Sequence, residues 1–236
     1  MSRDPKTMRF NPVVDSGEDI IHQHSNLCFV RGLIEGTDIL NVGCWTGCFE
    51  SLVAGTADSI TSLDIEPRAL EVARTRVPDV RFVEGSVLEL PFPDDSFDFV
   101  TAWALLEHIP AGTEPRALKE MARVLKPGGR LAVSTPSGRL LSKLLDPAYF
   151  LTGHRHYRVD VLTALLESAR FDVERYEVWG GWVTVLDYLS FYVWKYLFHG
   201  RVPEWPMFKR AYERDSSSAG FVNLYALSTL GDPPDD

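Results

Sequence analysis

Short apolar runs alternate with helical patterns along most of this chain, and that alternation restricts the fold more than any other feature. The apolar runs, each long enough for one strand, are residues 39–42, 59–63, 80–83, 97–102, 130–134, 171–178 and 221–228. The helical patterns between them are residues 49–54, 67–75, 115–125 and 159–169. Strands that alternate with helices form right-handed βαβ units and a parallel sheet. We therefore predict an α/β fold, with a doubly wound, mostly parallel seven-stranded sheet and helices on both faces.

The segments outside this alternation fit into one domain that spans residues 1–236. Residues 1–16 are polar and show no period, which predicts a loose arm. A helical pattern over residues 18–34 is expected to end at Gly36. Residues 202–218 are predicted to be a polar connector that leads into the last strand, within 219–230.

Residues 182–198 are apolar almost throughout, and Asp187 and Lys195 are their only charges. A helix that is apolar on all sides must be covered. Three interpretations stay open: a core or lid helix on the sheet, a contact between two copies of the chain, or a weak contact with a membrane surface, where Trp and Tyr favour the headgroup region. The chain is accordingly expected to be a monomer or a homodimer.

The charge balance argues against nucleic acid as a partner. The chain has 24 Lys and Arg residues against 33 Asp and Glu residues, a net charge of −9 at pH 7, and an acidic surface repels phosphate backbones. An odd number of cysteines, the lack of a leader and the lack of a membrane-spanning apolar run predict a cytoplasmic protein, at most peripheral to a membrane. Cys44 and Cys48 have no second pair to complete a zinc site, so no metal is predicted.

The sharpest local signal is the turn after the first predicted strand, Asp38-Ile-Leu-Asn-Val-Gly43-Cys-Trp-Thr-Gly47. Gly43 allows a tight turn and a close approach of a ligand to the backbone, and Gly47 allows the next helix to begin against the strand. The free N–H groups of that helix attract an anionic group. Many tight turns hold two glycines, so a purely structural turn stays an alternative.

The next predicted strand ends in Asp64, which lies 21 residues after Gly43. A carboxylate at this place accepts hydrogen bonds from the two hydroxyls of a ribose, as in nucleotide-binding α/β folds. The alternative is that Asp64 caps the helix that begins at Pro67. A nicotinamide dehydrogenase is excluded as the nucleotide enzyme, because the dinucleotide motif needs a third glycine and the chain has no room for its second domain.

Three later motifs resemble those of one family: Leu-Pro-Phe-Pro-Asp-Asp-Ser-Phe-Asp, Leu-Leu-Glu-His-Ile-Pro and Arg-Val-Leu-Lys-Pro-Gly-Gly-Arg-Leu. Together with the glycine turn and Asp64, they resemble the class I S-adenosylmethionine-dependent methyltransferases, in the branch that includes small-molecule, quinone and glycan-modifying enzymes. The resemblance covers residues 36–178 and implies a Rossmann-like fold with S-adenosyl-L-methionine as cofactor. It does not identify the methyl acceptor.

The resemblance implies a set of cofactor contacts along the edge of the sheet. The loop from Asn41 to Gly47 would hold the methionine part, Asp64 the ribose, and Ile65 one face of the adenine. The remaining contacts would be Ser86 and Val87 at the adenine edge, with Ala102 and Trp103 near the methionine and the sulfonium.

Three positions depart from the family pattern. The family usually has an acidic residue at Asn41 and a glycine at Trp45, and it often has an aspartate at Ser86. Because Ser86 still accepts a hydrogen bond, without charge assistance, we expect cofactor binding with altered detail.

The acceptor is predicted to bind at Gly153-His-Arg-His-Tyr-Arg158, which follows the fifth strand. The candidates for the general base are His156, His154 and, in the Leu-Glu-His motif, His108. The candidates for acceptor binding are Arg155, Tyr157 and Arg158. A solvated surface loop is the alternative for this cluster.

These features predict O-methylation of a hydroxyl or carboxylate on a small molecule or on a glycan, including a lipid-linked glycan. The alternative is a non-catalytic S-adenosylmethionine-binding sensor or scaffold of the same fold, which the changes at Asn41 and Trp45 would allow.

Overall fold

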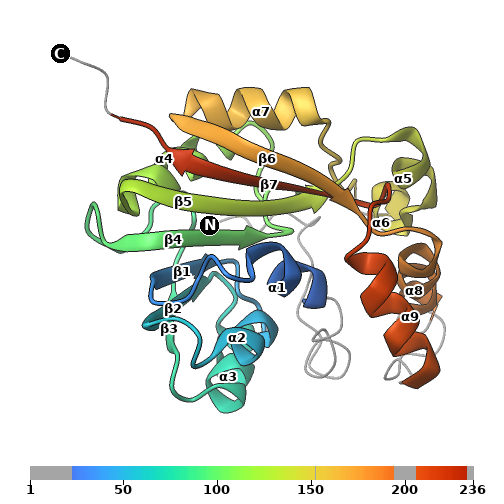
Figure 1. Cartoon of the computed structure of the whole chain (residues 1–236), viewed down its shortest axis with the longest axis horizontal. Coiled ribbons are helices and arrows are strands. Elements are labelled where there is room, and N and C mark those ends of the chain that lie inside the picture. Colours follow the sequence, from blue (N-terminus) through green and yellow to red (C-terminus); the bar gives the residue numbers. More distant parts are fainter. Residues whose placement is uncertain (1–22, 152, 194–205, 233–236) are drawn as a thin grey trace.

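A seven-stranded sheet in the order β3-β2-β1-β4-β5-β7-β6 crosses the molecule in a computed structural model that describes residues 23–151, 153–193 and 206–232 (Figure 1). The first five strands of that order run parallel, while β7 pairs antiparallel with both β5 and β6. The strands are β1 (Asp38–Val42), β2 (Ser59–Asp64), β3 (Arg81–Glu84), β4 (Phe97–Trp103), β5 (Leu125–Pro136), β6 (Phe171–Trp179) and β7 (Asn223–Leu230). The predicted fold class is thus confirmed.

Both faces of the sheet are buried, because successive side chains along a strand point to opposite faces and pack into two different apolar clusters. In β1, Leu40 and Val42 belong to one apolar cluster and Ile39 to the other, which is the pattern expected of a strand buried on both sides. Figure 1 shows one group of helices below the sheet and another above it. The lower group is α1 (His24–Val30), α2 (Cys48–Val53) and α3 (Pro67–Arg76), and the upper group is α4 (Glu114–Val124) and α7 (Val159–Ser168).

The first helix ends earlier than the apolar period predicts. We expected a helix over residues 18–34, but α1 ends at Val30, and residues 18–22 lie outside the described part of the chain. Arg31 takes an extended backbone conformation, and Gly32 follows at φ 76°. Ile34 is nevertheless buried in the same core as α1. Ile34 therefore fits the helical spacing of apolar residues because it is buried, although it lies in a turn after the helix.

Four helices lie beyond the ends of β5 and β6, on the right in Figure 1: α5 (Leu140–Leu145), α6 (Pro147–Leu151), α8 (Trp182–Val193) and α9 (Pro206–Ser216). Helices α5 and α6 escaped prediction because several of their apolar side chains are exposed and leave no helical period of burial. The prediction of a connector over residues 202–218 is wrong for α9, where Asp215 accepts hydrogen bonds from Gly181 N and Thr184 N. That carboxylate caps the start of α8 and fixes α9 against it.

Helix α8 buries one face and exposes the other. Thr184 and Val185 are buried, while Trp182, Leu186 and Leu189 are exposed. The prediction of a helix in this segment is confirmed for Trp182–Val193, and residues 194–198 lie outside the described residues. Contact of this exposed face with a second chain or with a membrane surface stays a prediction. Among the described residues, no helix is both long and apolar enough to cross a membrane.

Candidate functional site

The loops after β1 and β4 leave the carboxyl edge of the sheet side by side, at the place where ligands of open α/β sheets bind. Gly43 takes a left-handed conformation with φ 81°, and its N–H donates to Leu63 O at 2.7 Å. A Cβ atom at this position would lie only 2.9 Å from Leu105 Cδ1, a side chain of the β4 loop. The glycine therefore permits the two loops to approach each other closely.

Gly47 serves a different contact from the one we expected. It also has a positive φ of 74°, and a Cβ atom there would lie 3.0 Å from Ala73 Cβ on α3. This glycine thus allows α2 to begin against a neighbouring helix, whereas the sequence suggested close packing against the strand.

Trp45 occupies a left-handed backbone position between these glycines, with φ 49°. A side chain in this region costs about 1 kcal/mol, which explains why a glycine would be the usual residue here. Its N–H donates to Asp64 Oδ2 at 2.7 Å. The hydrogen bond holds the strained loop against the end of β2.

Asp64 lies at the carboxyl end of β2, where we predicted the ribose to bind. Its second oxygen, Oδ1, accepts a hydrogen bond of 2.9 Å from Glu66 N, and burial raises the pKa of its carboxyl group. Each carboxylate oxygen keeps a further lone pair for a hydroxyl donor. The helix α3 that follows is capped by the side chain of Glu66, so the alternative role of Asp64 as its cap does not apply.

Ile65 is 66% exposed beside Asp64, unusually open for a large apolar side chain. Its position beside the acid suits a flat apolar ring such as adenine.

Asn41 points below the loop into a buried polar network. Its Nδ2 donates to Glu50 Oε1 at 2.6 Å, and its Oδ1 accepts from Thr101 Oγ1 at 2.8 Å. Glu50 Oε1 also accepts from Ser62 Oγ at 2.6 Å, and burial raises the pKa of Glu50. The buried carboxylate of this network comes from α2, and Asn41 connects it to β4. A contact between the side chain of Asn41 and the cofactor stays a prediction.

The other predicted cofactor positions lie at the ends of β3 and β4. Val87 and Ala102 bury their side chains in the core, so their backbone is the part that can reach a ligand. Trp103 is also buried and packs its ring edge to face on Phe49, with centroids 5.4 Å apart. Ser86 Oγ accepts from Leu88 N at 3.2 Å. Contact of these positions with the cofactor stays a prediction.

The arrangement as a whole fits S-adenosylmethionine. The loop at Gly43 lies close to Leu105 of the neighbouring loop, a buried carboxylate stands at the end of β2, and an exposed apolar surface adjoins it. These three features match the methionine, ribose and adenine parts of the molecule in the order predicted for the edge of the sheet.

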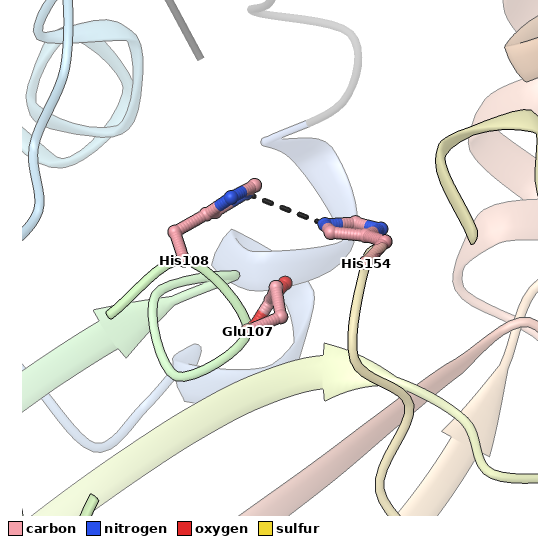
Figure 2. A group of neighbouring side chains, drawn as sticks. All are labelled: Glu107, His108 and His154. Atoms are coloured by element: carbon pink, nitrogen blue, oxygen red, sulfur yellow. Dashed lines mark hydrogen bonds between the residues drawn. The ribbon is translucent and has the colours of Figure 1, made fainter. Parts of the chain in front are cut away.

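A cluster of Glu107, His108 and His154 lies next to this crevice, two residues beyond Leu105 (Figure 2). Glu107 and His108 come from the loop after β4, and His154 comes from the segment between α6 and α7. Nε2 of His108 and Nε2 of His154 are 3.4 Å apart. One donor atom from each of the three residues lies within 4.8 Å of the others. The structure thus brings together two of the predicted base candidates.

Asp146 connects His154 to His156. Its Oδ2 accepts from His154 Nδ1 at 3.0 Å and from His156 Nε2 at 2.9 Å. Burial opposes the charged form of Asp146, but the hydrogen bonds from the two histidines lower its pKa well below the usual range. Burial likewise opposes protonation of His154, while the hydrogen bond to Asp146 and the charge of Glu107 raise its pKa.

His156 is enclosed on both sides of its ring. Its Nδ1 lies 2.9 Å from Ser137 O, its Nε2 contacts Asp146, and its side chain is 1% exposed. His154 keeps Nε2 directed at the cluster, whereas His156 has no ring nitrogen left for an acceptor. Catalysis by any of the three histidines stays a prediction, but this geometry favours His154 over His156.

Glu107 is a buried acid whose two carboxylate oxygens have no hydrogen-bond partner among the described residues. Burial raises the pKa of Glu107 to about 7. A buried carboxyl group with unmet hydrogen-bonding capacity is unusual and points to a function or a missing partner.

The three residues predicted to bind the acceptor have other partners. Arg155 pairs with Glu114 at 3.2 Å, the buried hydroxyl of Tyr157 donates to Glu114 at 3.0 Å, and Arg158 pairs with Asp160 at 2.9 Å. Arg155 and Tyr157 also line an open pocket of about 520 Å³. The pocket wall includes Lys143, Tyr149, His154 and His156.

Two residues of the site, Glu107 and Asp146, were missed in the sequence. Glu107 was part of a quoted motif, but nothing in the sequence showed that its carboxylate would be buried without a partner. Asp146 follows α5, a helix without a periodic apolar pattern, so its approach to two histidines further along the chain had no sequence signal.

Comparisons with known proteins agree with this geometry. Residues 40–133 match a family model described as a methyltransferase domain. Over 139 residues the chain is 35% identical to a "probable S-adenosylmethionine-dependent methyltransferase" of Mycolicibacterium smegmatis, which covers 59% of this chain and 53% of that protein. Over 136 residues it is 40% identical to demethylmenaquinone methyltransferase of Listeria welshimeri, which covers 54% of this chain and 56% of that protein.

Among solved structures, the "Crystal Structure of a putative sarcosine dimethylglycine methyltransferase from Galdieria sulphuraria" resembles the chain with a TM-score of 0.64 and 19% identity. The match covers 90% of this chain and 85% of the other, and it supports the fold. The chain spans about half the length of the curated relatives that it matches.

Proposed function

We propose that this chain, whose residues 40–133 match a methyltransferase-domain model, is a class I S-adenosylmethionine-dependent methyltransferase that transfers the methyl group of its cofactor to a hydroxyl oxygen of a small molecule or glycan. The observation that carries the proposal is the position of His154. Its Nε2 faces the Glu107–His108 loop, directly beyond Leu105, the residue against which the glycine loop packs. A group able to engage a hydroxyl thus adjoins the cofactor crevice.

The bound cofactor supplies a methyl group that is already strongly electrophilic because it is attached to a sulfonium. The residues of the chain therefore have to bind and orient both reactants. Asp64 would accept the ribose hydroxyls and at the same time holds Trp45 N, which fixes the loop around the methionine. Gly43, which has no Cβ atom, would leave room for that part of the cofactor beside Leu105.

In the transfer, a new carbon–oxygen bond forms as the carbon–sulfur bond breaks, and the electron pair of the broken bond stays on sulfur. The proton of the hydroxyl must leave the acceptor. Alignment of the oxygen, the methyl carbon and the sulfur accounts for much of the rate that a protein can provide. The cluster of Glu107, His108 and His154 would bind the acceptor hydroxyl, on the side of the methyl group opposite the sulfur.

A hydroxyl acceptor is favoured over a carboxylate by the state of the two arginines. Arg155 and Arg158 are the cations that we expected to hold a carboxylate, and both are already paired, with Glu114 and Asp160. A carboxylate would have to share these guanidinium groups with Glu114 and Asp160. A hydroxyl needs neither.

The proposal is tested by binding and turnover measured separately. Isothermal titration of the full chain with S-adenosylmethionine should show one site, and S-adenosylhomocysteine should form with members of a panel of phenols and glycans. Matched acceptors in which a carboxylate replaces the hydroxyl should give less product. Binding without product from any acceptor would support the non-catalytic sensor, and absence of binding would contradict both functions.

A further inference from the structure

We propose that Glu107, His108 and His154 form a binding site for a divalent transition-metal ion of the Zn²⁺ type. The role suggested below for the ion in methyl transfer rests on the proposed function, whereas the binding of the ion does not. We predicted no metal for this chain after weighing its cysteines, and the proposed site, which uses other residues, departs from that prediction.

The distance between the two imidazoles fits two ligands of one ion. Nε2 of His108 and Nε2 of His154 are 3.4 Å apart. Zinc lies about 2.0–2.1 Å from each histidine nitrogen, so two ligands at a tetrahedral angle are separated by about 3.3–3.4 Å. The rings are tilted by 38° with their centroids 4.8 Å apart, so they are not stacked in parallel. Figure 2 shows the two nitrogens facing each other across a short gap.

Glu107 provides the charge that such a site needs. Figure 2 shows one of its carboxylate oxygens directed toward the gap between the two rings. The residue is only 5% exposed, and neither oxygen has a hydrogen-bond partner in the described part of the chain. A buried carboxylate without partners is costly. A cation at the gap would satisfy it.

Asp146 supports the site from behind. Its Oδ2 accepts a hydrogen bond from His154 Nδ1, which fixes the ring and leaves the lone pair of Nε2 directed at the gap. Metal-binding histidines usually have such a carboxylate on their second nitrogen. The same Oδ2 is also held by His156 Nε2 at 2.9 Å.

An alternative ion site made of Asp146, His154 and His156 fits less well. The side chain of His156 is 1% exposed, and its Nδ1 contacts Ser137 O. Its Nε2 and the facing Asp146 oxygen are already joined to each other. An ion there would have to replace these hydrogen bonds, whereas the site at Glu107 requires replacing only the contact between the two imidazoles.

The ligand set determines the class of ion. Two imidazoles and one carboxylate suit Zn²⁺, Fe²⁺, Co²⁺ or Mn²⁺, whereas Mg²⁺ and Ca²⁺ prefer oxygen ligands throughout. Three protein ligands leave a coordination position open, as in catalytic zinc sites. A hydroxyl of the acceptor could occupy that position and would lose its proton to solvent more readily, because a bound cation lowers the pKa of a coordinated oxygen group.

The test measures binding of the metal alone. The full chain is first treated with a chelator, and Zn²⁺ is then titrated in competition with a chromophoric chelator. We expect one ion per chain, with affinity at least about 100-fold weaker in Glu107→Gln and in His154→Gln. Asp146→Asn should weaken binding about 10–100-fold, as loss of a supporting carboxylate does. Glu71→Gln, at an exposed acid on α3, is the matched control for Glu107→Gln and should bind as the wild type does.

A second measurement identifies the ligands directly. Co²⁺ replaces Zn²⁺ at such sites and gives visible absorption bands that depend on its ligands. These bands should appear in the wild type and in Glu71→Gln, and should disappear or shift in Glu107→Gln. Near-ultraviolet circular dichroism shows whether each variant is folded. Absence of stoichiometric binding to the wild type, or wild-type affinity in folded Glu107→Gln and His154→Gln, would overturn the site.

Failure of this inference and failure of the proposed function give different results. Methyl transfer by a chain that binds no Zn²⁺ in the titration would disprove the metal site and leave the proposed function standing. Stoichiometric Zn²⁺ binding without binding of S-adenosylmethionine would do the reverse.

Discussion

The backbone N–H of Trp45 donates a hydrogen bond of 2.7 Å to Oδ2 of Asp64, so the acid at the end of β2 directly holds the strained loop after β1. Two features that the sequence presented separately, the loop and the acid, thus act as one unit. Asp64 would therefore contribute to cofactor binding in two ways, by contact with the ribose and by fixing the loop.

Asp64→Ala should weaken S-adenosylmethionine binding by at least about tenfold. A hydrogen bond to a charged group contributes about 1.5–3 kcal/mol, and every 1.4 kcal/mol corresponds to a factor of ten in affinity. Isothermal titration gives the affinity, and Asp58→Ala, an exposed acid just before β2, is the control that should bind normally. Unchanged affinity in folded Asp64→Ala would remove this residue from the cofactor site.

The sequence predicted the sheet well because its strands carry their own evidence. A strand such as β1, buried on both faces, must be apolar at nearly every position, and this pattern is visible without any tertiary information. Helix ends depend on single backbone conformations. The end of α1 at Val30 is set by Arg31 and Gly32, while the apolar pattern continues to Ile34 for reasons of packing.

A site residue could be predicted from the sequence only where it belongs to a motif and also lies at the carboxyl end of a predicted strand. The carboxyl edge of β2 places Asp64 in the crevice whatever the remaining packing is. The roles of His154 and His156 depend instead on Asp146, which contacts both rings and directly follows α5, a helix with exposed leucines. Hydrogen bonds between distant parts of the chain decide which of the two histidines directs a ring nitrogen at the cluster. The spacing of residues in the sequence contains no information on these hydrogen bonds.

Gly43→Ala should reduce S-adenosylmethionine affinity strongly, and Gly55→Ala should not. Both glycines have nearly the same backbone conformation, φ 81° and φ 82°, so each substitution costs about 1 kcal/mol in unfolding free energy. A Cβ atom at Gly43 meets Leu105 Cδ1 at 2.9 Å, whereas nothing lies within 4 Å of one at Gly55. Equal affinities in titrations of the two variants would mean that the loop at Gly43 does not approach the ligand.

Glu50→Gln should become more stable relative to the wild type as the pH rises. Burial raises the pKa of Glu50 above that of the unfolded chain, so the folded state favours the protonated acid. The wild type therefore loses stability as the pH rises from the unfolded pKa, about 4.3, to the raised folded pKa, and the difference is constant above it. Glutamine keeps an oxygen that can accept from Asn41 and Ser62, as Glu50 Oε1 does.

Urea denaturation of Glu50→Gln and the wild type between pH 4.5 and pH 8 measures this difference. Glu71→Gln, an exposed acid on α3, should show no such trend and serves as the control. A difference that shrinks with rising pH would show that the buried carboxylate is stabilised in its charged form.

His154→Gln and His156→Gln should separate the two histidines of the acceptor loop. In His154→Gln, methyl transfer in a single turnover should fall by about 100-fold or more, because the ring nitrogen Nε2 that faces the cluster is lost, while S-adenosylmethionine affinity stays the same. In His156→Gln, the main loss should be about 2 kcal/mol of unfolding free energy, because a buried ring that contacts Asp146 and Ser137 O is replaced. The rate should fall less than in His154→Gln. His156→Gln could instead stay as stable as the wild type and lose the larger part of its rate. His156 would then be the residue that acts on the acceptor, as the sequence suggested, and Asp146 would position His156 and not His154.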